Sequence, residues 1–355
     1  MKPFETLTYR GQLGRLRRLA VEALRAYQVD EPHLTALLHE DNTTFRIDAA
    51  GGERYVLRIH RPTRKTLAQV RSEMLWLTFL RRRQETDLVV PQPVPRLDGD
   101  LVTVASVEGV PEPRMCVLLR WLPGRFVDKG LTPSHLERVG AFMARLHLSA
   151  AQYEPPDGFV RGRLDNLYGK PAPVGEALAR QGVDNPDDEA TAIRLVSEVC
   201  SPGDGARVGV LIDKIRAVQR ALGQGPDTFG LIHGDLHQEN YLFYKGQVRA
   251  IDFDDCGFGY YLYDLAVTAY EVGWRDDSAA LRTGLLAGYR SVRPLSPAHE
   301  DYLQTFMDLR ELQMMLWALE MREHPGFRDR WEGWVKETLE YIKEITESQK
   351  VGNDG

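Results

Sequence analysis

Three residues with oxygen-bearing side chains, Asp235, Asn240 and Asp252, are spaced in a way that favours a magnesium site. Asp235 and Asn240 lie five residues apart on a polar loop between short apolar strands, and Asp252 ends the following strand twelve residues later. The three side chains can therefore converge on one point. Mg²⁺ prefers oxygen ligands together with phosphate oxygens. Phosphoryl transfer also needs a carboxylate near the acceptor hydroxyl, so the spacing is compatible with that chemistry.

The same segment allows other interpretations. His233, Asp235 and His237 spell H-x-D-x-H, a pattern also compatible with transition-metal ligands, although Asn240 and Asp252 would then have no role. Two carboxylates also suggest a glycosidase pair, but that chemistry needs one protonated acid beside one base, and nothing here indicates it. The neighbouring Asp254 and Asp255 fit metal binding, contact with a cationic substrate or a turn cap, and the sequence leaves these three roles open.

The first third of the chain predicts an antiparallel meander with one amphipathic helix. The helix is predicted over 65–83, where apolar residues recur at helical spacing. Turn signals such as Ala50-Gly51-Gly52 separate segments rich in aliphatic and β-branched residues. The predicted strands are Leu34–His39, Thr43–Asp48, Arg54–His60, Leu101–Val107 and Met115–Trp121.

Helical periodicity dominates after a connector at Leu122-Pro123-Gly124. We therefore expect an N-terminal lobe over 1–122, a C-terminal lobe over 123–347 and a disordered tail over 348–355. A polar stretch over 153–202 is too long for a simple link and is predicted to be a substrate-side excursion. The predicted helices are Pro133–Leu148, Gly209–Leu222, Tyr261–Val272, Ala279–Tyr289, His299–Arg322 and Gly333–Ile345.

Composition limits the class of protein. The chain has 355 residues, 43% of them apolar and 27% charged, as in a globular protein of about two domains. No apolar run approaches the ~20 residues of a membrane span, and three scattered cysteines indicate neither a disulfide framework nor a thiolate zinc site. These features predict a cytoplasmic protein.

The two parts of the chain differ in charge. Residues 1–124 carry a net charge of +4 and the remaining residues a net charge of −10. The positive first part suits an anionic ligand, and the negative second part argues against nucleic-acid binding.

The segment His233-Gly234-Asp235-x-His237-x-x-Asn240, followed by Ile251-Asp252-Phe253-Asp254, resembles the catalytic core of the aminoglycoside phosphotransferase family. That family also includes choline kinases, type II homoserine kinases, methylthioribose kinases and a bacterial stress-response protein kinase. The resemblance covers roughly residues 34–272. It implies an α+β, protein-kinase-like fold of two lobes, with ATP bound in the cleft. The motifs of P-loop, serine-hydrolase, zincin and dinucleotide-binding proteins are absent.

The resemblance implies a role for each matched residue. Asp235 corresponds to the catalytic aspartate that orients the acceptor hydroxyl and takes up its proton, and Asn240 and Asp252 correspond to the ligands of Mg²⁺. His233 corresponds to a residue that braces the catalytic loop. Asp264 matches an aspartate at a helix start, for which we prefer a role as cap or loop brace.

The nucleotide side matches the kinase pattern less closely. Arg58 stands in the third strand where protein kinases have a lysine that contacts phosphates, and Glu73 is its predicted helix partner. Arginine remains charged and can contact phosphate, so the role is chemically possible. Val56 shares a strand face with Arg58 and is predicted to lie against adenine. The loop 40–44 lacks the glycines of a phosphate loop, so Asn42 and Thr43 are its predicted phosphate donors, although a plain Asx turn is equally compatible.

The hinge of this resemblance falls at Met115–Trp121 and the following Leu122-Pro123-Gly124, where backbone groups near Arg120 and Leu122 are expected to face the adenine edge. The resulting prediction is an ATP- and Mg²⁺-dependent kinase that phosphorylates a hydroxyl of a small molecule, such as an amino sugar, an amino alcohol or homoserine. The acidic second part suits an amine-bearing acceptor but equally suits ordinary surface charge. A protein Ser/Thr kinase and a catalytically inactive nucleotide-binding scaffold are the alternatives. Oligomeric state is not predicted.

Overall fold

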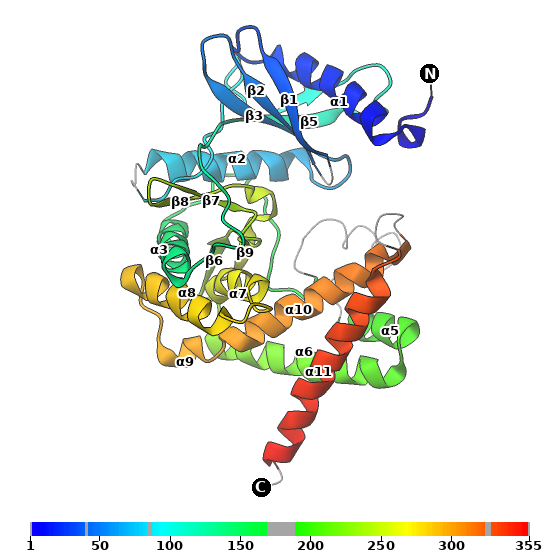
Figure 1. Cartoon of the computed structure of the whole chain (residues 1–355), viewed down its shortest axis with the longest axis vertical. Helices are drawn as coiled ribbons and strands as arrows, with labels where there is room; N and C mark the ends of the chain where they lie inside the picture. The colour runs from blue at the N-terminus through cyan, green and yellow to red at the C-terminus, as the bar shows by residue number, and fades with distance from the viewer. Residues whose placement is uncertain (1, 40–41, 84–86, 169–188, 324–327, 354–355) are drawn as a thin grey trace. The chain divides into compact units, whose positions relative to one another are not determined.

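The chain divides into two compact units. The computed structural model describes residues 2–39, 42–83, 87–168, 189–323 and 328–353, with side chains through residue 347. The first unit comprises residues 1–126, 153–161 and 241–254, and the second comprises 127–152, 162–240 and 255–355. Each unit is described by itself below, with element labels as in Figure 1.

The first unit is built on a five-stranded antiparallel sheet with the strand order β1-β2-β3-β5-β4. A separate two-stranded hairpin, β7–β8, also belongs to this unit. Its turn is Lys245-Gly246, and both residues have positive φ (49° and 80°), as expected for a two-residue hairpin. The elements are the 3-10 turn Phe4–Thr6, α1 (Tyr9–Leu24), β1 (His33–His39), β2 (Thr43–Asp48), β3 (Arg54–Ile59), α2 (Leu67–Arg82), β4 (Thr103–Ala105), β5 (Arg114–Arg120), β7 (Tyr241–Tyr244) and β8 (Gln247–Ala250).

The two faces of this sheet differ in the side chains that they carry. Successive strand residues point to opposite faces, and Leu57 and Ile59 point into a core that α1 covers through Leu19 and Ala23. Arg58 therefore points to the other face. That face is the side of α2, whose Glu73 contacts the Arg58 guanidinium. The alternation of β3 thus separates the packing face from a face that carries charge.

The first turn of α2 fixes where its side chains point. The Thr66 hydroxyl accepts from the Gln69 backbone N–H, and the Gln69 side chain accepts from the Thr66 N–H, which together form a capping box. From this start, Val70, Met74 and Leu77 form a buried stripe. Glu73 lies within the buried part of the helix and is fully inaccessible to solvent.

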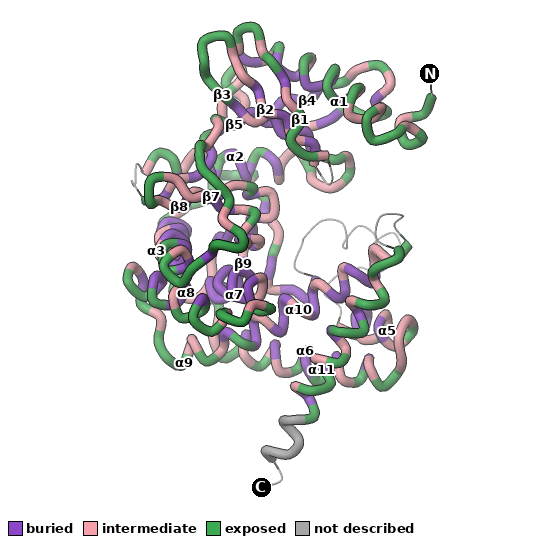
Figure 2. The backbone as a smooth tube through the Cα atoms, viewed as in Figure 1, coloured by how far each residue is buried: buried purple, intermediate pink, exposed green. Residues whose placement is uncertain are grey.

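The second unit is mainly helical, with a two-stranded β6–β9 pair beside the helices. Figure 2 shows that α7 and α10 are largely buried, whereas α11 exposes much of its surface. The elements are α3 (Pro133–Ala150), α5 (Glu189–Val199), α6 (Pro202–Leu222), β6 (Phe229–Ile232), β9 (Gly257–Tyr260), α7 (Tyr261–Glu271), α8 (Ser278–Val292), α9 (Pro297–Glu300), α10 (Leu303–Glu320), the 3-10 turn Met321–Glu323 and α11 (Trp331–Asn353).

Helices α3 and α8 approach each other so closely that glycine is required at the contact. A Cβ added at Gly288 of α8 would collide with the carbonyl oxygen of Glu137 of α3. A Cβ added at Gly140 of α3 would collide with the carbonyl oxygen of Leu285 of α8. These collisions involve backbone atoms, which cannot rotate away as a flexible side chain can.

The sequence predictions for the first part are correct for the presence of five strands and differ from the structure in three respects. Helix α1 was not predicted, because its apolar stripe alternates with a run of arginines that conceals it. The sheet is also not a simple meander, since β3 pairs with β5 and β4 lies at the edge beyond it. The strand predicted over 101–107 is confined to Thr103–Ala105.

The predictions for the second part differ mainly at element ends. Helix α6 begins at Pro202, seven residues before the predicted start, because Ser201 caps it and proline is favoured in a first turn. The helix predicted over 299–322 is divided into α9 and α10. Within the predicted excursion, α5 is helical and residues 153–161 belong to the first unit, while 169–188 lie outside the described residues. Helix α11 continues to Asn353, where a disordered tail was predicted, and residues 354–355 are not described.

The division into two units also differs from the predicted lobes, which were contiguous in sequence. The hairpin β7–β8 returns to the first unit, where Phe243 pairs with Arg125 and Arg249 donates to the Pro123 carbonyl. Asp252 and Asp254 therefore belong to the first unit, although they lie far along the chain.

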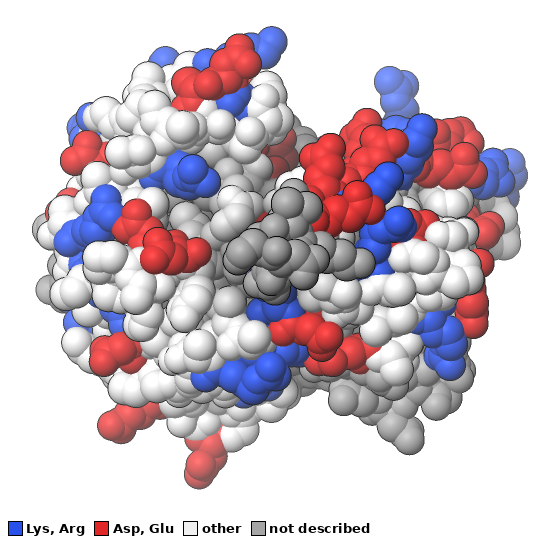
Figure 3. All heavy atoms as spheres, turned by 90° about the horizontal axis from the view of Figure 1, so that it is seen from below, with Lys and Arg blue, Asp and Glu red and all other residues white. Residues whose placement is uncertain are grey.

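The surface shows mixed charge on one face. On the described residues of the face drawn in Figure 3, Lys and Arg side chains lie among Asp and Glu side chains without a broad basic surface. Among the residues that the structure describes, no helix combines the length and apolar character needed to cross a membrane.

The close contact of α3 with α8 yields the first prediction. Gly288→Ala should lower the free energy of unfolding by about 2 kcal/mol, because the added methyl group forces two helix backbones apart. Gly14→Ala is the matched control, since an added Cβ there has no neighbour within 4 Å. Alanine is the better helix former, so this control should be stabilised by up to ~1 kcal/mol. Urea denaturation measures both changes, and equal stabilisation of the two variants would contradict the packing argument.

Candidate functional site

The residues with predicted chemical roles form two groups, one in each unit. In the first unit the structure brings together Arg58, Glu73 and Asp252. In the second unit it brings together Asp235 and Asn240. The position of one group relative to the other stays a prediction, as does the convergence of Asn240 with Asp252.

Arg58 is the centre of the first group. Its Nη2 donates to both carboxylate oxygens of Glu73 at 2.6 and 2.5 Å, and its Nη1 donates to Asp252 Oδ1 at 3.1 Å. The Arg58 and Glu73 side chains are 5% and 1% exposed, whereas that of Asp252 is 49% exposed. The predicted pair of Arg58 with Glu73 is present in the structure. Burial lowers the pKa of Arg58, but Glu73 and the nearby aspartates outweigh it, so the guanidinium stays charged.

Asp252 has an unusual backbone conformation. Its φ of 57° lies in the left-handed region, which a non-glycine residue adopts at a cost of about 1–3 kcal/mol. It directly precedes the 3-10 turn Phe253–Asp255 and follows the strand β8. Such strain persists only where surrounding contacts impose it, and the Arg58 contact is one of these. The chain therefore turns sharply at the predicted metal ligand.

Asp254, whose role the sequence left open, is held by several groups of the first unit. Its Oδ2 accepts from the Asn42 side chain at 3.2 Å and lies 4.0 Å from Lys65 Nζ. Its backbone carbonyl accepts from Lys65 Nζ at 2.8 Å and from the Arg161 guanidinium. Burial raises the pKa of Asp254, but Lys65 and Arg58 outweigh that effect and hold it well below its usual range. Asp254 is therefore an ionised link between the loop at Asn42 and the turn after Asp252.

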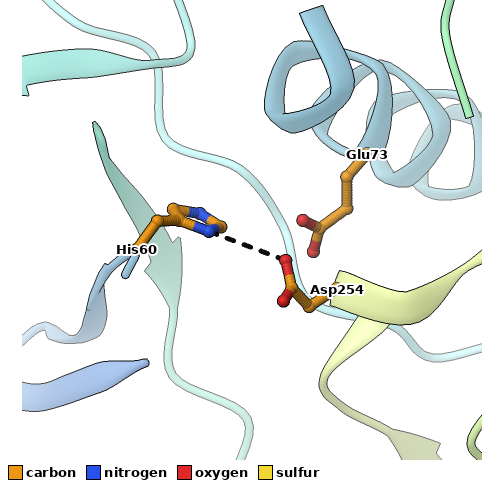
Figure 4. A group of neighbouring side chains, drawn as sticks. All are labelled: His60, Glu73 and Asp254. Atoms are coloured by element: carbon orange, nitrogen blue, oxygen red, sulfur yellow. Dashed lines mark ion pairs between the residues drawn. The ribbon is translucent and has the colours of Figure 1, made fainter. Parts of the chain in front are cut away.

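His60 lies in the same buried region. Both ring nitrogens lack a hydrogen-bond partner among the described residues, and Nδ1 is 3.6 Å from Asp254 Oδ1 (Figure 4). Burial, followed by the charge of Arg58, lowers the pKa of His60 to about 3. The imidazole is therefore neutral at physiological pH.

Ligand atoms of His60, Glu73 and Asp254 all lie within 4.8 Å of one another, a spacing that a metal ion would require. Glu73, however, already shares both oxygens with Arg58, and Lys65 and Arg161 bring two further positive charges to Asp254. A divalent cation would have to displace Arg58 and face these cations. The three residues are better described as part of a buried ionic network with one neutral histidine.

The remaining predicted nucleotide contacts differ in their surroundings. Val56 lies on the Arg58 face of β3, as predicted, and is partly exposed. The Thr43 side chain is buried with Phe45 on the opposite face, and its hydroxyl is 2.7 Å from His39 Nδ1. Thr44, which pairs with Arg58 across the strands, is the threonine on the charged face. Asn42 serves as a donor to Asp254 in the structure.

At the predicted hinge, the two backbone amides are in different situations. The Arg120 N–H donates to the Gln92 carbonyl at 2.9 Å and is already satisfied. Within the described part of the chain, the Leu122 N–H makes no backbone hydrogen bond. Leu122 is therefore the better placed of the two to offer a donor to an adenine edge.

The group of the second unit is organised by side chains that contact the loop 233–240 itself. Asn240 Nδ2 donates to the Asp235 carbonyl at 2.8 Å, which leaves the amide oxygen pointing elsewhere. Asp235 Oδ2 lies 3.4 Å from His237 Nε2, and Asp235 Oδ1 accepts from Arg310 at 2.6 Å. Burial lowers the pKa of His237, but the Asp235 carboxylate outweighs this effect and raises the pKa above its ordinary value.

Asp264 braces the loop from α7, as the sequence predicted. Its Oδ2 accepts from the His233 backbone N–H at 2.9 Å, and its Oδ1 accepts from the Gly234 N–H at 2.7 Å. His147 Nε2 lies 3.0 Å from the same carboxylate, and all these side chains are inaccessible to solvent. Gly234 has a φ of 83°, and an added Cβ would meet Leu164 at 2.6 Å. The start of the loop is therefore fixed by both hydrogen bonding and packing.

Sequence analysis missed four residues of these groups: His60, Lys65, Arg161 and Arg310. His60 follows Arg58 at the strand spacing of two, which was a usable signal. Arg310 lies in α10, which is rich in leucine and methionine, another usable signal, because a charge in a buried helix must have a partner. Lys65 and Arg161 gave no such signal.

The neutral, buried His60 predicts how stability depends on pH. In the unfolded chain this histidine takes up a proton as the pH falls below about 6.5. In the folded chain it does so only near its pKa of about 3, so the free energy of unfolding falls as the pH falls between these two values. At pH 5 the loss from this group is about 2 kcal/mol relative to pH 7. Between pH 7 and pH 5, His60→Gln should therefore lose about 2 kcal/mol less of its free energy of unfolding than the wild type does, as measured by urea denaturation. The exposed His33→Gln is the control, and identical pH slopes for wild type and His60→Gln would contradict the argument.

Comparison with known proteins identifies a family and several relatives. A family model described as a phosphotransferase enzyme family matches residues 33–302. Amicoumacin kinase of Bacillus subtilis (strain 168) is 25% identical over 309 residues, which cover 83% of this chain and 82% of that protein.

Two solved structures are similar over most of the chain. The microcompartment-associated aminopropanol kinase has a TM-score of 0.71 at 25% identity and covers 94% of this chain and 98% of its own. Amicoumacin kinase hAmiN, in complex with AMP-PNP, Ca²⁺ and Ami, has a TM-score of 0.72 at 20% identity and covers 94% and 96%. The fold is thus the protein-kinase-like one that the sequence predicted. Since the family model matches more than half of the chain, this protein belongs to the phosphotransferase enzyme family, whose members include small-molecule kinases, and acts on hydroxyl groups.

Proposed function

We propose that the protein is an ATP- and Mg²⁺-dependent kinase that transfers the γ-phosphate to a hydroxyl of an amine-bearing small molecule. The observation that carries this proposal is the buried Arg58, which contacts both Glu73 and Asp252. This is the connection expected between a phosphate-binding cation, its helix partner and a metal ligand. A nucleotide-binding scaffold without activity would have no need to keep all three groups together.

On the nucleotide side, Arg58 offers a fixed positive charge to phosphate oxygens, and Glu73 holds the guanidinium in place. Val56 supplies an apolar surface for adenine, with hinge donors at Leu122. The contacts of Asn42 and Thr43 to phosphate then come from the backbone, since both side chains have partners within the protein.

The residues proposed for the metal fit Mg²⁺ by their chemistry. Asp252 offers a half-exposed carboxylate, and the Asn240 amide nitrogen is engaged by the loop, so its oxygen is the atom available as a ligand. Both are oxygen donors, which Mg²⁺ prefers. When bound, Mg²⁺ neutralises the charge that develops on the transferred phosphoryl group.

Asp235 is the proposed base. Its carboxylate is partly exposed on a rigid loop, where it can accept a hydrogen bond from the acceptor hydroxyl and take up its proton as the oxygen attacks phosphorus. The chain contributes mainly position, because phosphoryl transfer requires little covalent chemistry from the protein.

An amine-bearing acceptor is supported by two observations. The relatives reported above act on amicoumacin and aminopropanol, according to their names. In this chain Glu271 lies at the end of α7, 3.7 Å from Arg310, which itself contacts Asp235. This carboxylate is thus close to the base and able to attract an ammonium group.

The central test is ADP release from ATP with and without Mg²⁺ in the presence of candidate acceptors. The panel contains 1-amino-2-propanol, ethanolamine, choline, homoserine, methylthioribose, aminoglycosides and a generic protein acceptor, with water as the acceptor of background hydrolysis. An amine-bearing alcohol should stimulate release at least tenfold. Asp235→Asn should abolish the stimulation, because the amide cannot accept the proton, and should leave ATP binding intact.

The other outcomes discriminate between the alternatives. Transfer of labelled phosphate to protein alone would favour a protein kinase. Unaltered turnover in Asp235→Asn would overturn the assignment of the base, and failure of the wild type to bind Mg·ATP would favour a scaffold.

A further prediction tests whether Arg58 performs the role of the lysine that protein kinases have at this position. Arg58→Met should lose about a hundredfold in kcat/KM for ATP, because a charge-assisted contact of ~1.5–3 kcal/mol is lost and Glu73 is left without its cation. Arg58→Lys keeps the charge but cannot contact Glu73 and Asp252 together, so its KM for ATP should rise about tenfold. Thermal unfolding separates these effects from loss of fold, and a KM unchanged in both variants would contradict the proposed phosphate contact.

A further inference from the structure

Arg310 of α10 contacts the proposed base from a distant part of the chain. Its Nη2 donates to Asp235 Oδ1 at 2.6 Å, and the two residues are 75 positions apart in the sequence. The Arg310 side chain is 6% exposed and that of Asp235 is 15% exposed. This ion pair is therefore shielded from water, where an electrostatic contact is stronger than at the surface.

Arg310 is itself held from two sides. Its Nη1 lies 3.5 Å from the Tyr263 hydroxyl, and its Nη2 lies 3.7 Å from Glu271 Oε1. Tyr263 donates to Gln313, one turn further along α10, and Gln313 donates to the Asn166 carbonyl. The guanidinium is thus supported by a buried chain of hydrogen bonds, and its position does not depend on Asp235 alone.

The two carboxylate oxygens of Asp235 have different neighbours. Oδ1 accepts from Arg310 at 2.6 Å, and Oδ2 faces His237 Nε2 at 3.4 Å. An arginine keeps its protons at every working pH, so it cannot replace Asp235 as the proton acceptor. Arg310 therefore acts on the orientation of the Asp235 carboxylate and not on its protons.

We propose that Arg310 is a positioning residue of the transfer reaction, which fixes the Asp235 carboxylate through Oδ1 in the orientation that receives the acceptor hydroxyl. The inference rests on the proposed function, in which Asp235 is the base. In the step that it serves, the acceptor oxygen forms a bond to the γ-phosphorus as the bond from that phosphorus to the ADP oxygen breaks. The hydroxyl proton passes to the Asp235 carboxylate.

The test compares Arg310→Met, Arg310→Lys and Arg310→Ala, assayed with the most active acceptor of the panel above, including water. Arg310→Met should lower kcat about a hundredfold, because a misplacement of a catalytic group by ~1 Å costs that much. The KM for Mg·ATP should stay within twofold of wild type. Arg310→Lys keeps the charge and should recover at least tenfold over Arg310→Met, and it remains informative if Arg310→Met does not fold.

Chemical rescue provides a readout that a purely structural role would not move. Guanidinium chloride at concentrations far below denaturation should restore part of kcat in Arg310→Ala, because the free cation can occupy the vacated position beside Asp235. The same concentration of urea should not. Arg216→Met is the matched control, since Arg216 makes three hydrogen bonds in the same unit and none to the catalytic loop. Its kcat should stay unchanged.

Three results would overturn the inference. One is a wild-type kcat in Arg310→Met, and another is a rise in the KM for the acceptor alone, which would make Arg310 an acceptor-binding residue. The third is equal rescue by urea and guanidinium. Asp235→Asn, assayed in parallel, separates the two proposals. If it is inactive while Arg310→Met is fully active, the positioning role fails and the proposed function stands. If Asp235→Asn is fully active, the proposed function itself fails.

Discussion

The buried guanidinium of Arg58 is the constraint on which the first unit depends. Removing such a charge from water is costly, and an unpaired one would destabilise the fold by about 3–5 kcal/mol. Glu73 must therefore face β3, and the capping box at Thr66 starts α2 at the residue that makes this possible. Asp252 must likewise reach Arg58, which helps to hold its backbone in a left-handed conformation.

In the second unit the buried charged group that must be satisfied is a carboxylate. Asp264 is inaccessible to solvent and is satisfied by two backbone N–H groups of the catalytic loop and by His147. The His147 ring is itself 2.9 Å from the Tyr289 hydroxyl, so the loop is connected to α3 and to α8. The close glycine contact between these two helices thus supports the same network that positions Asp235.

The sequence was sufficient for the parts of the site that are local. Asp235 and Asn240 are joined within one loop, and the strand alternation correctly placed Val56 and Arg58 on one face. Glu73 was proposed from the resemblance to kinases, in which the cation of the third strand pairs with a carboxylate on the following helix. Thr43 shows the limit of such local reasoning, because the choice between it and Thr44 depends on the register of β2 with β3.

The parts that could not be predicted depend on long-range packing. Arg161 and Lys65 meet at the carbonyl of Asp254 from segments about 90 and 190 residues away in sequence, and no periodicity encodes that meeting. Helix α1 was concealed for a different reason, since its buried leucines and alanines alternate with arginines that give the segment a polar composition. Arg310 was detectable as a charge in a helix rich in leucine and methionine, but its partner was not.

The use of arginine at both centres has a consequence for how the site responds to pH. Arg58 and Arg310 each contact acceptors from two elements at once, which the forked guanidinium allows and a lysine does not. Burial lowers the pKa of both guanidinium groups, but it is outweighed by the neighbouring carboxylates at Arg58, and by Tyr263 with Asp235 and Glu271 at Arg310, so their charge is constant. Burial lowers the pKa of His60 and of His147, which therefore stay neutral. For His237, burial also lowers the pKa, but the carboxylate of the proposed base Asp235 outweighs burial and raises the pKa above its ordinary value.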